Sequence, residues 1–200
     1  MKKKIAVGLL IAVAIVLSYF YANIDKNSYM YDRDAETETY VSTGVLCEGE
    51  TLTQSFVAEE DTIDGINIKL SLSGYAKEAV LRYVILDEQA QKLAEATVSG
   101  DELENNKFNL LKIPQIKDTK DKRFTLVLAE QNTDEQNGIS FYLEPTPQEE
   151  HKLTIKGNDT AGTLVARTVC HRFDVETFVV LLGMLTFIVV FMRALYKLFK

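Results

Sequence analysis

Residues 62–74 read TIDGINIKLSLSG, and this stretch decides the class of fold. Ile66, Ile68, Leu70 and Leu72 alternate strictly with polar residues along it. Successive side chains of a β-strand point to opposite faces, so an apolar residue at every second position predicts a strand with one buried face. The stretch therefore indicates a protein that contains β-strands.

Short apolar runs of the same kind recur on both sides of this stretch. The predicted strands cover residues 52–57, 66–72, 80–86, 92–98, 110–113, 124–128, 139–143, 152–155 and 163–169. Polar turn sequences such as Asn105-Asn106 and Asn137-Gly138 separate them. The run 80–86 is apolar on both faces, which predicts a strand in the interior of its sheet. About nine short strands with regular turns indicate a mainly β protein built as an antiparallel β-sandwich.

The more apolar face of each alternating run predicts the core between the two sheets. These inward-facing residues are Ile66, Ile68, Leu70, Tyr83, Ile85, Phe124, Leu126, Phe141 and Leu143. Sustained helical periodicity is not found in this region, although residues 90–96 would also fit a helical turn.

The two ends of the chain are strongly apolar. Ile5–Ala22 contains no charged residue, and neither does Thr177–Met192. At 1.5 Å per residue these helices would cover roughly 27 Å and 24 Å, against a hydrocarbon core of about 30 Å. The first segment also resembles a secretory signal peptide, but aromatic residues among positions 18–22 disfavour cleavage. Both segments are therefore predicted to be transmembrane helices, the second extended by snorkelling of Arg193.

Basic residues predict the orientation of these helices. Lys2, Lys3 and Lys4 precede the first, and Arg193, Lys197 and Lys200 lie in or after the second. The positive-inside rule places both termini in the cytoplasm and the central domain on the exterior of the cell membrane. Tyr19, Tyr21, Tyr29, Tyr31, Phe173 and Phe178 would suit the outer interface of the bilayer.

The region between the helices, residues 23–174, is acidic. Only six of the 22 basic residues and one of the 29 acidic residues lie outside it, which leaves it a net charge of −12. Binding to nucleic acid is disfavoured because phosphate groups require the opposite charge. The predicted organisation is an N-terminal anchor (1–22), an acidic stalk (23–39), an exterior β-sandwich (40–174), a C-terminal helix (175–193) and a basic cytoplasmic tail (194–200).

The two cysteines, Cys47 and Cys170, both fall in the exterior region. Two anchors at one membrane surface bring the first and last strands of a sandwich to the same end. We therefore expect the two cysteines to lie close together, and an oxidising exterior would then permit a disulfide. Two separate thiols are the alternative.

Three segments together resemble the jelly-roll modules of bacterial surface proteins. They are LTQSFVAEEDTIDGINIKLSLSG (52–74), VLRYVILDEQAQKLAEATVSGDELENNKFNL (80–110) and KRFTLVLAEQN (122–132). Similar modules occur in exterior parts of membrane proteins from Gram-positive polysaccharide systems, often near glycosyltransferases. The resemblance implies a jelly-roll fold over roughly residues 51–169 and a setting in the cell envelope.

Motifs for chemistry are scarce. The chain has no GxSxG, HExxH, CxxC or Gly-rich phosphate loop, so no catalytic residues and no cofactor are predicted. The densest group of carboxylates, and hence the weak candidate for a metal site, is Glu59, Glu60, Asp61 and Asp64; solvated loop residues are the simpler interpretation. The histidines, His151 and His171, are interpreted as exposed.

Sugar sites usually stack rings on exposed aromatic residues, and the chain has no Trp. Tyr75 on the Ser73-Gly74-Tyr75 loop is the single weak candidate for a glycan ligand.

The sequence leaves two main candidate functions. A third, an exterior hydrolase, is the least supported. The first is a non-enzymatic accessory protein of the cell envelope, held in the lipid bilayer and partnering a membrane protein such as an enzyme of surface polysaccharide synthesis. The alternative is a membrane-tethered carbohydrate-binding module. An aromatic groove would favour a glycan, and a flat apolar patch would favour a protein partner.

Overall fold

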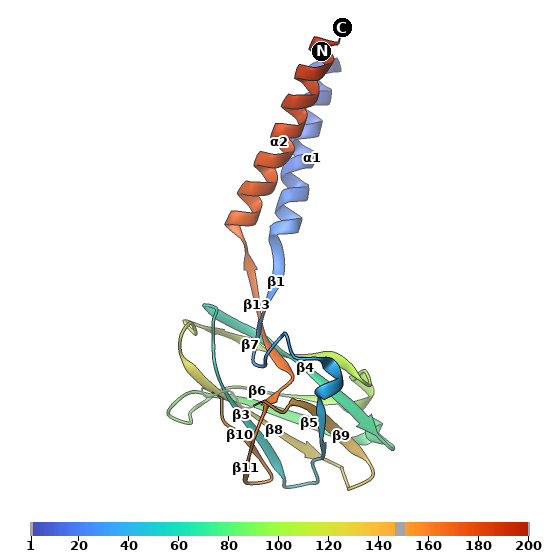
Figure 1. Ribbon diagram of the computed structural model, residues 1–200, viewed down its shortest axis with the longest axis vertical. Coiled ribbons are helices and arrows are strands. Elements are labelled where there is room, and N and C mark those ends of the chain that lie inside the picture. Colours follow the sequence, from blue (N-terminus) through green and yellow to red (C-terminus); the bar gives the residue numbers. More distant parts are fainter. Residues whose placement is uncertain (1, 147–150, 200) are drawn as a thin grey trace. The chain divides into compact units, whose positions relative to one another are not determined.

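Two terminal helices and thirteen strands make up the part of the chain that the structure describes (Figure 1). This computed structural model describes residues 2–146 and 151–199. The chain divides into two compact units. One consists of Met1–Lys26 and His171–Lys200, and the other of Asn27–Cys170.

The helices are α1 (Lys2–Ala22) and α2 (Val175–Leu198). Most strands agree with the sequence prediction within a few residues. The strands are β1 (Asn23–Tyr29), β2 (Val41–Val45), β3 (Thr51–Val57), β4 (Thr62–Ser73), β5 (Val80–Leu86), β6 (Lys92–Ser99), β7 (Lys107–Lys117), β8 (Arg123–Gln131), β9 (Gly138–Glu144), β10 (Leu153–Ile155), β11 (Asn158–Thr160), β12 (Thr163–Leu164) and β13 (Ala166–Phe173). Short 3₁₀ turns are η1 (Thr37–Thr39), η2 (Ala76–Glu78) and η3 (Gly100–Glu102).

The strand order is that of a jelly roll. One sheet contains the antiparallel series β2-β9-β4-β7 and the other contains β3-β8-β5-β6. From β2 to β9, every connection except the one between β5 and β6 passes from one four-stranded layer to the other, which is the eight-stranded, double Greek-key pattern. The predicted antiparallel sandwich is confirmed, and β5 lies between β6 and β8, as expected for a strand that is apolar on both faces.

The remaining strands extend this framework. The β10–β11 hairpin adds to the second sheet beside β3. In the first sheet, β13 pairs with the beginning of β4, whose end pairs with β9. Because β12 pairs with the end of β9, the β12–β13 segment fills the space where β4 and β9 diverge. β1 then pairs with β13 at the margin of the sheet.

The core lies between the two sheets and contains every residue predicted for it. Ile68, Leu70, Ile85, Leu126 and Phe141 are 0% exposed, and all nine predicted residues belong to one buried cluster. The inward positions alternate along each strand because the pleat directs every second side chain to the same face.

The expected acidic stalk is partly a strand. Residues 23–29 form β1 and residues 37–39 form η1, although the sequence there is polar and lacks alternation. The polar sequence shows no sign of β1 because this edge strand forms by pairing with β13. The helical turn considered for residues 90–96 is also wrong, since β6 occupies most of it.

Of the two predicted spans, α2 alone among the described residues has the length and composition to cross a membrane. The apolar part of α1 is shorter and covers Gly8–Ala22. Fifteen residues cover only about 22 Å, less than a hydrocarbon core of about 30 Å. The structure therefore supports one membrane-length helix and a shorter apolar one.

Candidate functional site

A surface cavity lies where the β5–β6 turn and the β7–β8 turn come together; we call it the turn cavity. Its volume is about 510 Å³, within the 300–1,000 Å³ typical of small-molecule sites. The residues that line it are Asp87, Glu88, Gln89, Leu93, Ile116, Lys117, Asp118, Lys122, Arg123 and Phe124.

Hydrogen bonds hold the β5–β6 turn in shape. The Asp87 carboxylate accepts hydrogen bonds from the backbone N–H groups of Gln89 (2.9 Å) and Gln91 (2.8 Å). Ala90 has a φ of 59°, the left-handed conformation that allows so short a connection. An aspartate that caps its own turn in this way explains why the chain reverses here.

The β7–β8 turn is fixed by the connection between β3 and β4. Thr119 donates from its hydroxyl to the carbonyl of Glu60 (2.6 Å) and from its N–H to the carbonyl of Asp61 (3.1 Å). Asp121 donates its N–H to the carbonyl of Ala58 (2.7 Å). Both walls of the turn cavity are therefore held by internal hydrogen bonds.

The lining combines an apolar floor with charges of both signs. Leu93 is 42% exposed and Phe124 is nearly buried, while three basic and three acidic side chains surround them. Ammonium and guanidinium groups only donate hydrogen bonds and ionised carboxylates only accept them. Because sugar hydroxyls do both, this lining suits a polyhydroxylated ligand that carries no large net charge.

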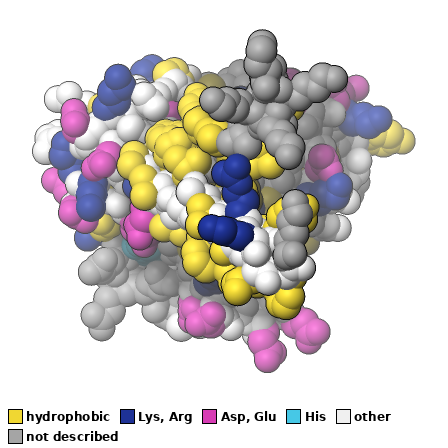
Figure 2. Space-filling view, turned by 90° about the horizontal axis from the view of Figure 1, so that it is seen from above, with side chains coloured by type: hydrophobic (Ala, Val, Ile, Leu, Met, Phe, Trp, Pro, Cys, Tyr) yellow, Lys and Arg dark blue, Asp and Glu magenta, His cyan; other side chains and the backbone are white. Residues whose placement is uncertain are grey.

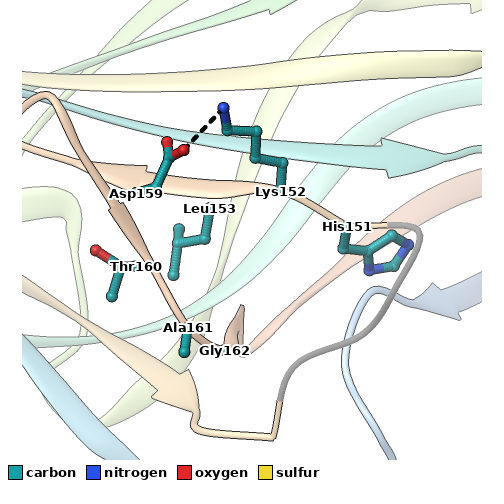
Figure 3. Close-up of a pocket in the computed structure, with 7 residues that line it drawn as sticks. All are labelled: His151, Lys152, Leu153, Asp159, Thr160, Ala161 and Gly162. Atoms are coloured by element: carbon teal, nitrogen blue, oxygen red, sulfur yellow. Dashed lines mark ion pairs between the residues drawn. The ribbon is translucent and has the colours of Figure 1, made fainter.

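The second cavity, about 310 Å³, lies along the β10–β11 hairpin (Figure 3). Its charged residues Lys152 and Asp159 pair with each other at 3.0 Å, and Thr154 also donates to Asp159. His151 points away from this ion pair, and its Nδ1 lies 2.7 Å from the carbonyl oxygen of Met30. The polar groups here mainly stabilise the hairpin and its neighbours.

The four carboxylates proposed as weak metal ligands are not brought together. Glu60 is buried, whereas Glu59 and Asp61 are exposed. Asp64 accepts hydrogen bonds from Thr62 and Gln115. Within residues 2–146 and 151–199, no group of three or more His, Cys, Asp or Glu side chains is arranged to hold a metal ion.

Tyr75 lies on the loop that follows β4, as predicted, and is 85% exposed. Its N–H donates to the side-chain oxygen of Asn137 at 2.9 Å. Gly74, with φ of +56°, brings the backbone so close to Asn137 that a Cβ would lie 2.2 Å from Asn137 Oδ1. The ring is accessible to a ligand, but it is not one of the residues that line the turn cavity.

The predicted disulfide is absent from the structure, in which Cys47 and Cys170 are both free. Cys47 lies in the connection before β3, and Cys170 Sγ lies 3.1 Å from the hydroxyl of Thr62, the first residue of β4. β3, whose seven residues span about 23 Å, runs between these two places. The prediction failed because β1, and not the strand near Cys47, is the first strand and the partner of β13.

A layer of aromatic and basic side chains, which the sequence analysis missed, covers the outward face of the first sheet. This aromatic–cation layer consists of Tyr29, Tyr31, Tyr40, Lys69, Phe108, Tyr142 and Arg167. Lys69 Nζ lies 5.1 Å and 5.0 Å from the ring centroids of Tyr40 and Tyr142. Arg167 Cζ lies 4.3 Å from the ring centroid of Phe108 and 5.8 Å from that of Tyr29.

Cation–π contacts of this kind each contribute about 0.5–2 kcal/mol. They hold residues 29–40 against the sheet. Tyr29 and Tyr31, which the sequence analysis predicts for the membrane interface, belong to this layer and to the unit Asn27–Cys170. The ring faces are occupied by the protein's own cations, so this layer stabilises the fold first of all.

A buried acid lies at the end of β8. Glu130 is 1% exposed, and its Oε2 accepts the N–H of Ile139 at 2.9 Å. Burial raises the pKa of Glu130 to about 8, although the N–H groups of Ile139 and Leu46 act in the opposite direction. The negative charge of Glu50 raises this pKa further. Glu130 is therefore a carboxyl that stays protonated into the neutral range.

Charges of both signs are mixed on the surface. Figure 2 shows Lys and Arg side chains interspersed with Asp and Glu side chains on one face. Described residues on that face therefore present no extended field of a single sign, as a polyanion such as nucleic acid would require.

No protein-family model and no curated protein matches the chain. One solved structure of related shape is the crystal structure of the infectious bursal disease virus VP2 subviral particle, at a TM-score of 0.32 and 10% identity. The match covers 73% of this chain and 40% of the viral chain, so the protein spans less than half the length of the chain that it matches. A TM-score this low does not establish a shared fold. The jelly-roll assignment rests on the strand order of the two sheets. The resemblance to bacterial envelope modules gains no support from these comparisons.

Proposed function

We propose that this protein is a non-enzymatic, membrane-anchored accessory protein of the cell envelope, with its jelly-roll unit outside the cytoplasm. The observation that carries the proposal is the surface of α2. This helix is 24 residues long, and none of its residues is buried. Leaving so many apolar side chains in water is unfavourable, and a lipid bilayer removes that cost.

The N-terminal helix supports a two-helix anchor. Within residues 8–22, the least exposed positions are Ala14, Ser18 and Ala22, which are spaced by four. Side chains at this spacing lie on one face of a helix, and small ones allow a second helix to approach closely. The other side chains of this stretch are exposed and mostly apolar, as lipid contact requires. The basic residues near both chain ends favour cytoplasmic termini.

The partner in this proposal is a membrane protein, such as an enzyme of surface polysaccharide synthesis. This choice follows from the sequence resemblance to exterior modules of polysaccharide systems. A protein that is itself held in the bilayer meets such a partner by diffusion in two dimensions, so even a weak contact between the two is effective.

The proposed topology is tested with three epitope tags on the full-length chain in intact cells. One tag is placed at each terminus and one between Asn105 and Asn106, in the exposed turn before β7. Protease added outside the cells is expected to remove only the internal tag. Removal of a terminal tag, or protection of the internal tag in cells without a further outer barrier, would refute the topology.

A second candidate function is glycan binding, favoured by the mixed donors, acceptors and apolar floor of the turn cavity. Full-length protein in lipid nanodiscs is expected to retain mono- to tetrasaccharides from a defined array. Because each lost hydrogen bond to a charged group costs about 1.5–3 kcal/mol, Lys122→Ala or Asp118→Ala should weaken binding on the order of tenfold or more.

Tyr75→Ala is the matched control, since this exposed ring lies outside the cavity lining. Binding that is lost in Tyr75→Ala and kept in the two cavity variants would place the site on the Tyr75 loop instead. Failure to retain any sugar on the array would remove the glycan hypothesis.

A further inference from the structure

Four aromatic rings form a connected group at one end of the helix pair; we call them the aromatic collar. They are Tyr19, Phe20, Phe173 and Phe178. The ring centroids of Tyr19 and Phe20 lie 6.0 Å apart, those of Tyr19 and Phe173 5.6 Å, and those of Phe173 and Phe178 5.3 Å. All four belong to the helical unit, in which α1 and α2 run side by side with their outer ends together (Figure 1).

The two chain segments are also tied at the level of the collar. The Asp174 N–H donates to the carbonyl of Ala22 at 2.8 Å, and the Asp174 carboxylate accepts from the N–H and the hydroxyl of Thr177. Asp174 thus caps the first turn of α2. Satisfied backbone groups at this point are what a helix needs where it enters hydrocarbon.

The collar rings remain accessible although they contact one another. Tyr19 is 50% exposed, Phe20 68% and Phe173 39%. The distribution of charged residues along the chain changes at the level of the collar. Acidic side chains lie at the level of the collar itself, at Asp174 and Glu176, and directly beyond it Asp25 and His171 pair at 2.7 Å. On its other side, Thr177–Met192 carries no charge. Aromatic rings concentrate at this kind of boundary in membrane proteins, because they are apolar bodies that tolerate the hydrated headgroup region.

The length of α2 agrees with this placement. From Asp174 to Lys197 the helix rises about 34 Å, slightly more than the hydrocarbon thickness of about 30 Å. A collar at one interface therefore brings Lys197 to the other, with Arg193 about 6 Å short of it and within reach by snorkelling. Phe187 then lies about 20 Å from the collar, deep in the acyl region.

From these observations we infer that the aromatic collar binds the headgroup–acyl boundary of the exterior leaflet and fixes the depth of the helix pair. The ligand surface is the lipid interface itself. This inference rests on the membrane insertion in the proposed function and adds the level at which the chain crosses the exterior surface.

Single tryptophans test the depth, because the chain contains no Trp. The full-length variants Phe173→Trp, Phe20→Trp, Phe187→Trp and Tyr75→Trp are reconstituted in phosphatidylcholine vesicles whose lipids carry bromine at a shallow or a deep acyl position. At the two collar sites, shallow bromine is expected to quench at least about twofold more than deep bromine, because interfacial aromatic rings lie at the headgroup level. Phe187→Trp should show the reverse, and Tyr75→Trp should respond to neither lipid.

The outcomes separate the inference from the proposed function. Absence of quenching for Phe187→Trp in both lipids would overturn membrane insertion. Deep quenching of Phe187→Trp together with deep or absent quenching at both collar sites would overturn the collar alone. Phe20→Trp reports from α1 and keeps the test decisive if Phe173→Trp fails to fold.

Discussion

Replacing Glu130 by Gln is expected to make the β-domain more stable at alkaline pH and to remove much of its pH dependence. Between about pH 4.5 and pH 8 the folded state keeps the Glu130 proton, whereas the unfolded state has released it. The free energy of unfolding therefore falls by about 1.4 kcal/mol per pH unit over this interval. The stabilising contribution is complete below about pH 4.5 and is lost as the pH rises through about 8, a loss on the order of 5 kcal/mol.

The amide of Gln carries no charge at any of these pH values and keeps an oxygen that accepts the Ile139 N–H. Urea unfolding of the full-length chain, followed by circular dichroism from pH 5 to pH 9, measures the difference between the two proteins. The wild-type and Glu130→Gln curves should coincide near pH 5 and separate progressively above it. Gln131→Glu, which adds an exposed carboxylate at the next position, is the control. Parallel pH profiles for wild type and Glu130→Gln would show that Glu130 is ionised in the folded state.

Truncation of the core should produce effects of similar size. Ile68 on β4 and Leu126 on β8 are both 0% exposed and belong to the cluster between the two sheets. Ile68→Ala and Leu126→Ala should each lower the free energy of unfolding by about 2–5 kcal/mol, from lost burial and the cavity left behind.

Adjacent leucines on β7 provide a matched control for this experiment. Leu111 is 1% exposed and Leu110 is 43% exposed, because neighbouring side chains of a strand point to opposite faces. Leu111→Ala should behave like the core variants, whereas Leu110→Ala should cost about 1 kcal/mol or less. Equal losses for both leucines would contradict the assigned orientation of β7.

The alternation of apolar residues was sufficient to predict most strands and the core, because burial on one face imposes a period of two. β1 could not be found in this way. Its sequence, NIDKNSY, has no apolar face, and the strand exists because residues 166–173, more than a hundred positions away, provide its hydrogen-bonding partner. The same long-range pairing explains why the disulfide prediction chose the wrong strand.

The candidate sites differ in how far the sequence alone could predict them. The turn cavity combines residues of two turns about 30 positions apart, and only the folded chain shows that they meet. Glu130, in contrast, had a signal that the sequence analysis did not use. Phe124, Leu126 and Leu128 all point inward, and position 130 continues the same register. A carboxyl at an inward position is a direct indication of a buried acid.

The position of the β12–β13 segment between β4 and β9 has a consequence for biosynthesis. Ala166 pairs with Ile68 across about 100 residues, so the first sheet remains incomplete until nearly the whole β-sandwich has been made. Until then, the growing chain presents unpaired edges of β4 and β9, the kind of surface that pairs with other chains. Only Asp174 separates the end of β13 from the beginning of α2. Closure of the sheet and synthesis of α2 are therefore neighbouring events in the growth of the nascent chain.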